Sequence, residues 1–173
     1  MFDTVLIAGL GLMGGSMAKT IKARTLSRVL GWNRTRATAE QALADGSIDA
    51  IATEALYKEA DLVIIGLYPQ ATVDWLLENM PKMKKGCVIV DMVGVKQFMV
   101  DHLEQAALDA GVHYVGGHPM AGREFSGLDF ALPTLFDGAS MIFVPTKSST
   151  ERVLEQLEVY FMSLGFGQTV RCT

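Results

Sequence analysis

The sequence predicts a doubly wound α/β domain, in which a mostly parallel sheet carries helices on both faces. Short apolar runs alternate with amphipathic segments along the whole chain, which is typical of strands joined by crossover helices. The runs TVLIA at 4–8 and DLVIIGL at 61–67 show no polar alternation, which indicates strands buried on both sides. A length of 173 residues fits a single domain of this kind, spanning 1–173.

Each predicted element follows from its local pattern. Strands are expected where a compact apolar run is bounded by turn residues, at 4–8, 28–32, 61–67, 87–91, 112–115, 140–144 and 167–171. Helices are expected where apolar residues recur at helical spacing, from residue 14, at 35–44, from Pro69 to Gly86, between residue 91 and Gly111, and at 151–164. The segment 120–138 has no such periodicity and is expected to be irregular.

Composition narrows the function classes. Lys+Arg 15 against Asp+Glu 19 gives a net charge of −4, so we expect no nucleic-acid partner, because phosphate binding needs a concentrated basic surface. No apolar stretch reaches about 18 residues, so no membrane span is expected. Cys87 and Cys172 stand far apart without a CxxC or His–Cys cluster. We therefore expect no metal site, no disulfide framework and a reducing, cytoplasmic compartment.

A glycine-rich loop follows the first predicted strand. The segment GLGLMG at 9–14 is a complete GxGxxG between a strand and a helix, which is the context of a dinucleotide-binding fingerprint in a Rossmann-type domain. Gly9 permits the tight turn, Gly11 the approach of a pyrophosphate and Gly14 the close packing of helix on strand. The N-terminus of the helix that follows supplies unpaired N–H groups for the phosphate charge. A glycine-rich turn without a ligand is the alternative interpretation.

The residues after the second predicted strand bear on the choice of dinucleotide. An NAD site usually has Asp or Glu here, whereas this sequence has Asn33, Arg34, Thr35 and Arg36. No carboxylate is present to bind a ribose 2′-hydroxyl, and two guanidinium groups can grip a 2′-phosphate. The sequence therefore favours NADP over NAD. The alternative is that both arginines are solvated residues of the helix's first turn.

Three loops lie at the carboxyl edge of the predicted sheet, where ligands of such folds bind. They are 67–69, with Leu67 and Tyr68, then 91–96, with Gly94, and 116–127, with His118. His118 precedes a proline, which favours extended backbone at the end of its strand. Its place at this edge makes it a candidate general base.

The other two histidines have no such placement. His102 falls within a predicted helix and His113 within a predicted strand. We expect both to be structural residues that hydrogen-bond to the backbone.

Three segments resemble the prephenate dehydrogenase family, which includes arogenate dehydrogenases. They are GLGLMGGS at 9–16, DMVGVK at 91–96 and GHPMAGREFSG at 117–127, and the last is the most specific. The resemblance implies a Rossmann-type first domain, followed in the family by a helical dimerisation domain that contributes to the substrate site. That second domain is expected to be absent from this chain, so a homodimer is expected only of a longer protein, and the isolated domain is expected to turn over substrate poorly.

The resemblance also implies the reaction and its residues. Family members oxidise and decarboxylate prephenate or arogenate, with NADP or NAD as hydride acceptor, in tyrosine biosynthesis. His118 then corresponds to the catalytic histidine, which accepts a hydrogen bond from the ring 4-hydroxyl. Arg123, Glu124 and Ser126 are candidate substrate-binding residues. The candidate cofactor-binding residues are Gly9, Gly11, Leu12, Met13, Gly14, Asn33, Arg34, Thr35, Arg36, Leu67, Tyr68 and Gly94.

The sequence departs from the family pattern at two positions. The family often has a serine in place of Gly94, whose hydroxyl contacts the histidine and the substrate. Arg123 replaces a small polar residue; it could hold a substrate carboxylate or be an exposed arginine. Lys96 could face the site, but we expect a surface lysine at the start of a helix.

Two alternatives to the leading hypothesis remain open at this point. A hydroxyacid dehydrogenase of the 6-phosphogluconate type also favours Asn-Arg-Thr after its second strand. Nothing in this sequence resembles the substrate-site glycine motif of those enzymes. A nucleotide-sensing module without catalysis is the second alternative, and the position of His118 counts against it.

Overall fold

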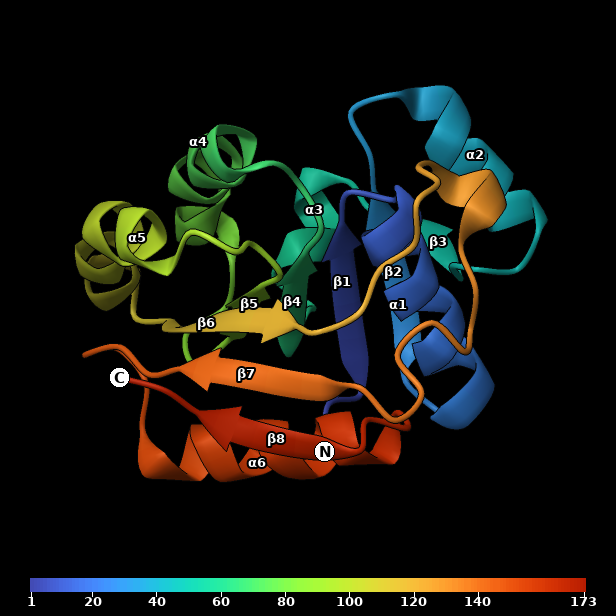
Figure 1. The fold of residues 1–173 in the computed structure, drawn as a ribbon. Helices are drawn as coiled ribbons and strands as arrows, with labels where there is room; N and C mark the ends of the chain where they lie inside the picture. Colours follow the sequence, from blue (N-terminus) through green and yellow to red (C-terminus); the bar gives the residue numbers. More distant parts are fainter.

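The computed structural model describes residues 1–173, which form one eight-stranded sheet with the order β3-β2-β1-β4-β5-β6-β7-β8 (Figure 1). Neighbouring strands are parallel except β6 and β7, which pair antiparallel. The elements are β1 Thr4–Ala8, α1 Leu12–Arg24, β2 Arg28–Trp32, α2 Arg36–Ala44, β3 Ala50–Ile51, α3 Glu54–Tyr57, β4 Leu62–Ile65, α4 Pro69–Asn79, the 3-10 turn η1 Met80–Lys82, β5 Val88–Asp91, α5 Lys96–Ala110, β6 His113–Pro119, the 3-10 turn η2 Leu128–Phe130, β7 Ser140–Val144, α6 Glu151–Ser163 and β8 Gln168–Arg171. The predicted doubly wound fold is confirmed.

Helices cover both faces of the sheet and enclose two hydrophobic cores. Helices α1, α2 and α6 pack on one face, where Met17 joins Val5 and Ile7 of β1. Helices α3, α4 and α5 pack on the other, where Leu103 joins Leu6 of the same strand. Successive residues of β1 therefore enter opposite cores, which is why the strand is apolar without alternation.

The structure differs from the predicted elements at two short elements, at the end of β6, and at the helix expected from Pro69 to Gly86, which ends at Asn79 and is followed by η1. Strand β3 has only two residues and α3 only four, too short for a periodicity to register. Strand β6 was expected to end at Val115 but continues to Pro119. It does so because it changes partner: it pairs with β5 as far as Val115 and with β7 from Gly116 onward.

The irregular segment 120–138, here called the strap, folds back over the glycine-rich loop. It leaves the end of β6, crosses α1 and reaches α2 before it returns to β7 (Figure 1). The backbone N–H of Leu132 donates to Ser16 Oγ at 3.0 Å, and Thr20 Oγ1 donates to the carbonyl of Pro133 at 3.1 Å. These two bonds fix the strap to the buried side of α1.

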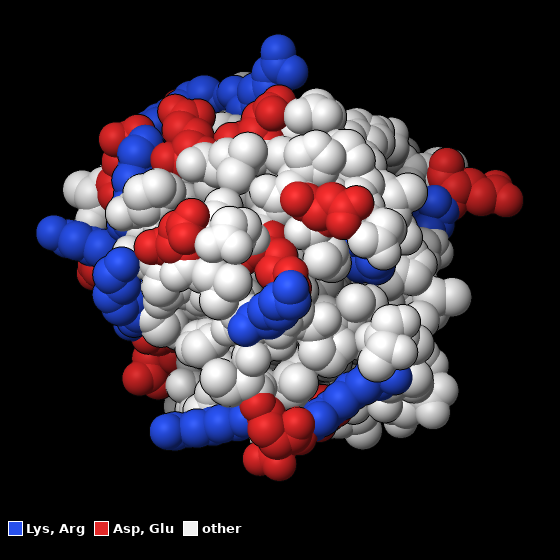
Figure 2. All heavy atoms as spheres, turned by 90° about the vertical axis from the view of Figure 1, so that its left-hand side faces the viewer, with Lys and Arg blue, Asp and Glu red and all other residues white.

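Surface charge is mixed on the side of the molecule where α5 lies. Basic and acidic side chains are interspersed there (Figure 2). Ion pairs such as Lys147–Glu104, at 4.0 Å with the lysine side chain 82% exposed, contribute little because solvent screens them. Stability therefore rests on the two cores. None of the helices combines the length and the apolar character that a bilayer crossing requires.

Candidate functional site

The glycine-rich loop is shaped by contacts that exclude side chains. Gly9 has a φ of +95°, and a Cβ on it would lie 2.5 Å from the carbonyl oxygen of Gly66. A Cβ on Gly14 would lie 1.7 Å from the carbonyl oxygen of Gly9. Around Gly11, by contrast, no atom lies within 4 Å of the Cβ position. Packing thus requires glycine at positions 9 and 14, whereas Gly11 leaves its backbone open to a ligand.

A cleft of about 500 Å³ opens above this loop, at the carboxyl ends of β1 and β4. Its lining is Gly9, Gly11, Leu12, Met13, Asn33, Arg34, Gly66, Leu67, Tyr68, Ala71, Met92, Phe125, Ser126 and Gly127. Helix α1 starts at the floor of the cleft, with Gly11 as its N-cap and no acidic residue in its first turn. Its N-terminal N–H groups are therefore suited to bind a phosphate of a dinucleotide.

Most of the predicted cofactor residues line the cleft. The exceptions are Gly14, which is buried, Thr35 and Arg36, which lie on the exposed start of α2, and Gly94, which lies beside His118. Arg36 forms an exposed ion pair with Glu40 at 3.4 Å.

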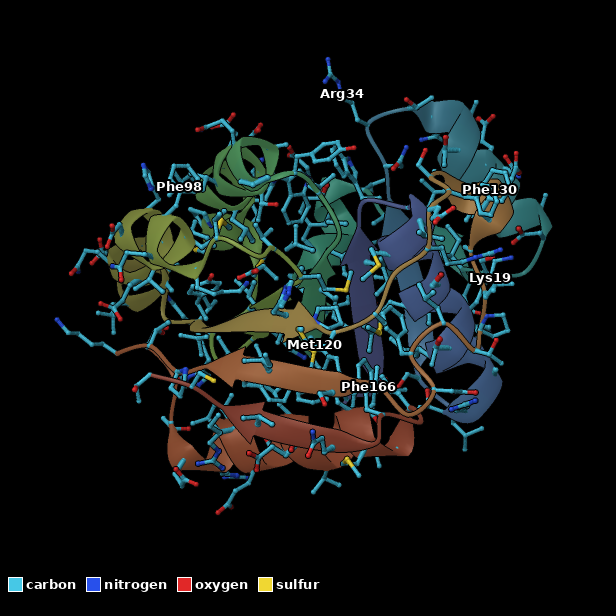
Figure 3. The ribbon with its side chains drawn as sticks, viewed as in Figure 1. Lys19, Arg34, Phe98, Met120, Phe130 and Phe166 are labelled. Atoms are coloured by element: carbon cyan, nitrogen blue, oxygen red, sulfur yellow. The ribbon has the colours of Figure 1, made fainter.

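Asn33 and Arg34 occupy different environments at the end of β2. Asn33 Oδ1 accepts the backbone N–H of Leu10 at 2.9 Å, and Nδ2 donates to the carbonyl of Thr35 at 3.1 Å. The Asn33 side chain therefore holds the glycine-rich loop against β2. Arg34 has no ion-pair partner and projects away from the molecule (Figure 3), so its guanidinium is available to an anion at the rim of the cleft.

His118 lies near the end of β6, with a buried ring nitrogen that has no partner. Nδ1 makes no hydrogen bond, although buried polar atoms rarely go unpaired. A Cβ on Gly94 would lie 3.6 Å from Cε1 and 3.9 Å from Nδ1, so the buried edge of the ring faces this glycine. Nε2 is not buried and has no hydrogen-bond partner, so it is the nitrogen that can exchange a proton with a bound group.

The other histidines match the structural role predicted for them. His102 Nδ1 lies 2.8 Å from the carbonyl oxygen of Phe98, one turn earlier in α5. His113 Nδ1 lies 2.6 Å from the carbonyl oxygen of Ser148. Both rings are bound to backbone, and the prediction is confirmed.

Lys96 is not the surface lysine that the sequence analysis expected. Its ammonium forms an ion pair with Asp91, whose side chain is fully buried at the end of β5. The aliphatic part of Lys96 packs over Gly116, where a Cβ would lie 3.0 Å from its Cδ. Burial lowers the pKa of Lys96, while the neighbouring carboxylate acts in the opposite direction. The buried carboxylate requires a counter-charge, which explains why this lysine turns inward.

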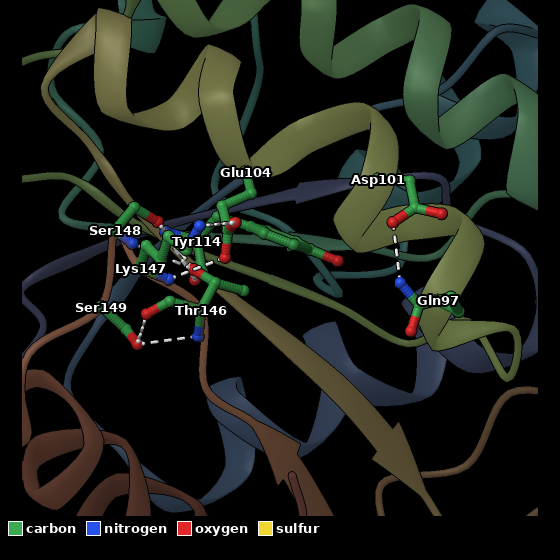
Figure 4. Close-up of polar contacts among 8 residues, drawn as sticks. All are labelled: Gln97, Asp101, Glu104, Tyr114, Thr146, Lys147, Ser148 and Ser149. Carbon is green, nitrogen blue, oxygen red and sulfur yellow. Dashed lines mark hydrogen bonds and ion pairs between the residues drawn. The ribbon is translucent and has the colours of Figure 1, made fainter.

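Tyr114 completes the group around Asp91. Its hydroxyl donates to Asp91 Oδ2, and burial raises the pKa of Tyr114, so the phenol keeps its proton. The strand is anchored behind it, since the Tyr114 backbone N–H donates to Ser148 Oγ at 2.9 Å and its carbonyl accepts from Thr146 Oγ1 at 2.6 Å (Figure 4). These contacts fix the strand that carries His118.

The three predicted substrate residues lie on the strap and are not gathered at one point. Arg123 donates to the carbonyl of Phe130 at 2.8 Å and lies over the ring of Phe125, 5.3 Å from its centroid. Ser126 lines the cleft above the glycine-rich loop, on the cofactor side. Glu124 is exposed and makes no hydrogen bond or ion pair.

The sequence patterns single out Ser126 but not Asp91, Tyr114 or the two other strap residues of the cleft, Phe125 and Gly127. An aspartate at the end of a buried strand, five residues before a lysine, was an available signal for the buried pair. No local pattern could show that Phe125 and Gly127 return to the glycine-rich loop, because that return depends on tertiary contacts.

The strand order reverses at β1, whose carboxyl end opens on the cleft, and doubly wound sheets bind their ligands at such a point. The fold and the cleft define a nucleotide-binding domain of the Rossmann type. A family model described as "Prephenate dehydrogenase, nucleotide-binding domain" matches residues 17–167, and the chain belongs to this family. Membership decides against the 6-phosphogluconate-type alternative.

Comparisons with individual proteins indicate the same family. The chain is 37% identical over 162 residues to a prephenate dehydrogenase of Bacillus subtilis, covering 91% of this chain and 43% of that protein. Synechocystis arogenate dehydrogenase superposes with a TM-score of 0.88 at 26% identity, over 98% of this chain and 59% of that one. Prephenate dehydrogenase from Aquifex aeolicus, in complex with hydroxyphenyl propionate and NAD+, gives 0.89 at 25% identity, over 100% and 60%. The chain thus spans about half the length of these relatives.

Proposed function

We propose that this chain is the cofactor-binding half of an enzyme that oxidises and decarboxylates prephenate or arogenate, with NADP preferred over NAD. The observation that carries the proposal is the imidazole of His118, which makes no hydrogen bond and lies near the carboxyl end of β6, at the same edge of the sheet as the cleft. The relatives named as prephenate and arogenate dehydrogenases support the substrate class. The ring of prephenate or arogenate already carries the carboxylate and the hydroxyl that react. The enzyme therefore needs to supply only a proton acceptor and a hydride acceptor.

The residues present fit a dinucleotide. Gly11 leaves backbone open above the loop, the start of α1 offers N–H groups to the pyrophosphate, and Leu67, Tyr68 and Arg34 line the same cleft. When bound, the nicotinamide supplies the hydride acceptor. The protein would hold that acceptor near His118 and keep the two in a fixed relative orientation.

His118 acts on the ring 4-hydroxyl. Its accessible ring nitrogen, Nε2, accepts the hydroxyl proton as the C–O bond becomes a carbonyl and the hydrogen on the same carbon leaves as hydride. Loss of the ring carboxylate as CO₂ then gives an aromatic ring, and the proton held by His118 returns to the phenolic oxygen. The strong driving force of aromatisation means that the protein needs to orient the ring rather than strain it.

The cofactor preference rests on Arg34. Its unpaired guanidinium lies at the rim of the cleft, and no acidic residue occupies the end of β2. A 2′-phosphate there would gain charge-assisted hydrogen bonds that a 2′-hydroxyl could not make.

The remaining features of the enzyme are also proposals. Because the relatives are about twice as long, we propose that a second, helical domain completes the substrate site and forms a homodimer. Cys87 and Cys172 are free thiols, which fits a reducing, cytoplasmic compartment.

The experiment that tests this function is prephenate- or arogenate-dependent reduction of NADP and NAD. Two proteins are compared. One is the 173-residue chain, and the other is the same chain extended by any coding sequence that follows residue 173 in the gene. We expect the short chain to bind dinucleotide and to turn over substrate very poorly, and the longer protein to be active. Turnover by neither protein, with dinucleotide binding intact, would reject the proposed reaction.

A further inference from the structure

The strap brings a carboxylate to the edge of the cleft that faces α2. Gln41 Nε2, on α2, donates to Asp129 Oδ1 at 2.6 Å. No second hydrogen bond and no ion pair involves Asp129, so Oδ2 is free to accept. The neighbouring Leu128 is buried against Gly15, where a Cβ would lie 2.7 Å from its Cδ1. The position of Asp129 is therefore set by packing on one side and by a hydrogen bond on the other.

Asp129 lines a second hollow of about 310 Å³ that adjoins the cleft. Its lining is Leu10, Gly11, Asn33, Thr38, Gln41, Gly127, Leu128 and Asp129. Gly11, Asn33 and Gly127 line both spaces, so the hollow and the cleft adjoin at these residues. Asp129 is the only acidic residue among these lining residues.

Asn33 lacks the charge of the acidic residue found at the end of β2 in an NAD site, and both ends of its side chain already hold the loop. Its oxygen is bound to Leu10 and its nitrogen to Thr35. In such a fold the pyrophosphate approaches the second glycine of the loop, here Gly11, and the ribose 2′-hydroxyl is bound at the end of β2. The 2′ position of that ribose would thus lie near Asn33, which lines the same hollow as Asp129.

We propose that Asp129 is a cofactor-specificity residue, which accepts the 2′-hydroxyl of NAD and repels the 2′-phosphate of NADP. The proposal rests on the proposed binding of a dinucleotide in the cleft. The strap supplies, from a distant part of the sequence, the carboxylate missing from the end of β2. Asp129 and Arg34 then act in opposite directions, and the measured preference is the balance between them.

The test is the ratio of the NAD and NADP dissociation constants, measured by titration for wild type and for Asp129→Asn. The substitution removes the charge and keeps an oxygen that Gln41 can bond. We expect the ratio to move toward NADP by about tenfold, since removal of one like charge and of one charge-assisted acceptor is worth roughly this much. Melting temperatures confirm that both proteins are folded.

Asp101→Asn is the matched control. Asp101 accepts from Gln97 Nε2 at 2.7 Å on α5, an exposed Gln–Asp bond of the same kind away from the cleft (Figure 4). Its ratio should stay within about twofold of wild type.

The outcomes separate the two proposals. An unchanged ratio in Asp129→Asn, or an equal change in Asp101→Asn, would overturn the role of Asp129. A wild type that prefers NAD, with the preference reduced in Asp129→Asn, would support the role of Asp129 and reject the NADP preference. A wild type that binds neither dinucleotide would overturn both. The titration contains no prephenate. A failure of the proposed reaction would therefore appear only in the turnover assay and not in this ratio.

Discussion

The imidazole of His118 faces the backbone of Gly94, and a Cβ at that glycine would lie 3.9 Å from the unpaired Nδ1. Gly94 has no positive φ, and the nearest atom to its Cβ position is at ordinary van der Waals distance. The site therefore has room for a small side chain next to the histidine. The serine that the resemblance implies at this position would fit without backbone change.

Gly94→Ser is expected to raise activity in the longer, active protein. The added hydroxyl can hydrogen-bond to Nδ1 of His118, and one such bond is worth about 2- to 10-fold in kcat/KM. Gly94→Ala is the matched control, because it adds the same Cβ without the hydroxyl. Equal kcat/KM in the two variants would show that the histidine gains nothing from a hydroxyl at this position.

His118→Ala is expected to lower kcat by about 10²–10⁴, the usual contribution of a general base. Dinucleotide affinity should stay nearly constant, because His118 does not line the cleft. His102→Ala controls for loss of an imidazole, since His102 is exposed and bonded to Phe98 within its own helix. A large loss of dinucleotide binding in His118→Ala would mean that the residue is structural.

Arg34→Ala is expected to weaken NADP binding about 10- to 150-fold and to change NAD binding little, because one charge-assisted bond contributes roughly 1.5–3 kcal/mol. The effect should shrink at high salt, since the guanidinium is exposed. Arg36→Ala is the control, as Arg36 pairs with Glu40 and lies outside the cleft. An equal loss of affinity for NAD and NADP would show that Arg34 does not distinguish a 2′-phosphate from a 2′-hydroxyl.

Lys96→Met is expected to destabilise the fold by about 3–5 kcal/mol, because it leaves a buried carboxylate without its counter-charge. Lys147→Met is the control: its exposed ion pair with Glu104 should contribute about 0–1 kcal/mol. The measurement is the free energy of unfolding in urea. Equal effects of the two substitutions would place the Lys96–Asp91 pair among the weak surface pairs.

Local patterns predicted the parts of the molecule that local geometry determines. The glycine spacing at 9–14 predicted the turn, because Gly9 has a positive φ and Gly14 is packed against the carbonyl of Gly9 within the same strand–loop–helix unit. The strands buried on both faces of the sheet were likewise predicted from their uninterrupted apolar runs.

Contacts between segments that are distant in the sequence could not be predicted from local patterns. The inward turn of Lys96 depends on a buried carboxylate from β5, and the engagement of Asn33 depends on the N–H of Leu10. The return of Asp129 to α2 depends on how the whole strap packs on α1. Such contacts have no periodicity along the chain, so they emerge only when the elements are assembled.

The change of partner along β6 places a constraint on insertions and deletions. His118 pairs with Ile142 of β7, and no β5 residue pairs with this part of the strand. The face of the sheet from which the imidazole leaves is set by alternation along β6, counted from Val115, the last residue that pairs with β5. A single-residue insertion between Val115 and His118 would turn the imidazole to the opposite face without touching any residue predicted to bind cofactor or substrate.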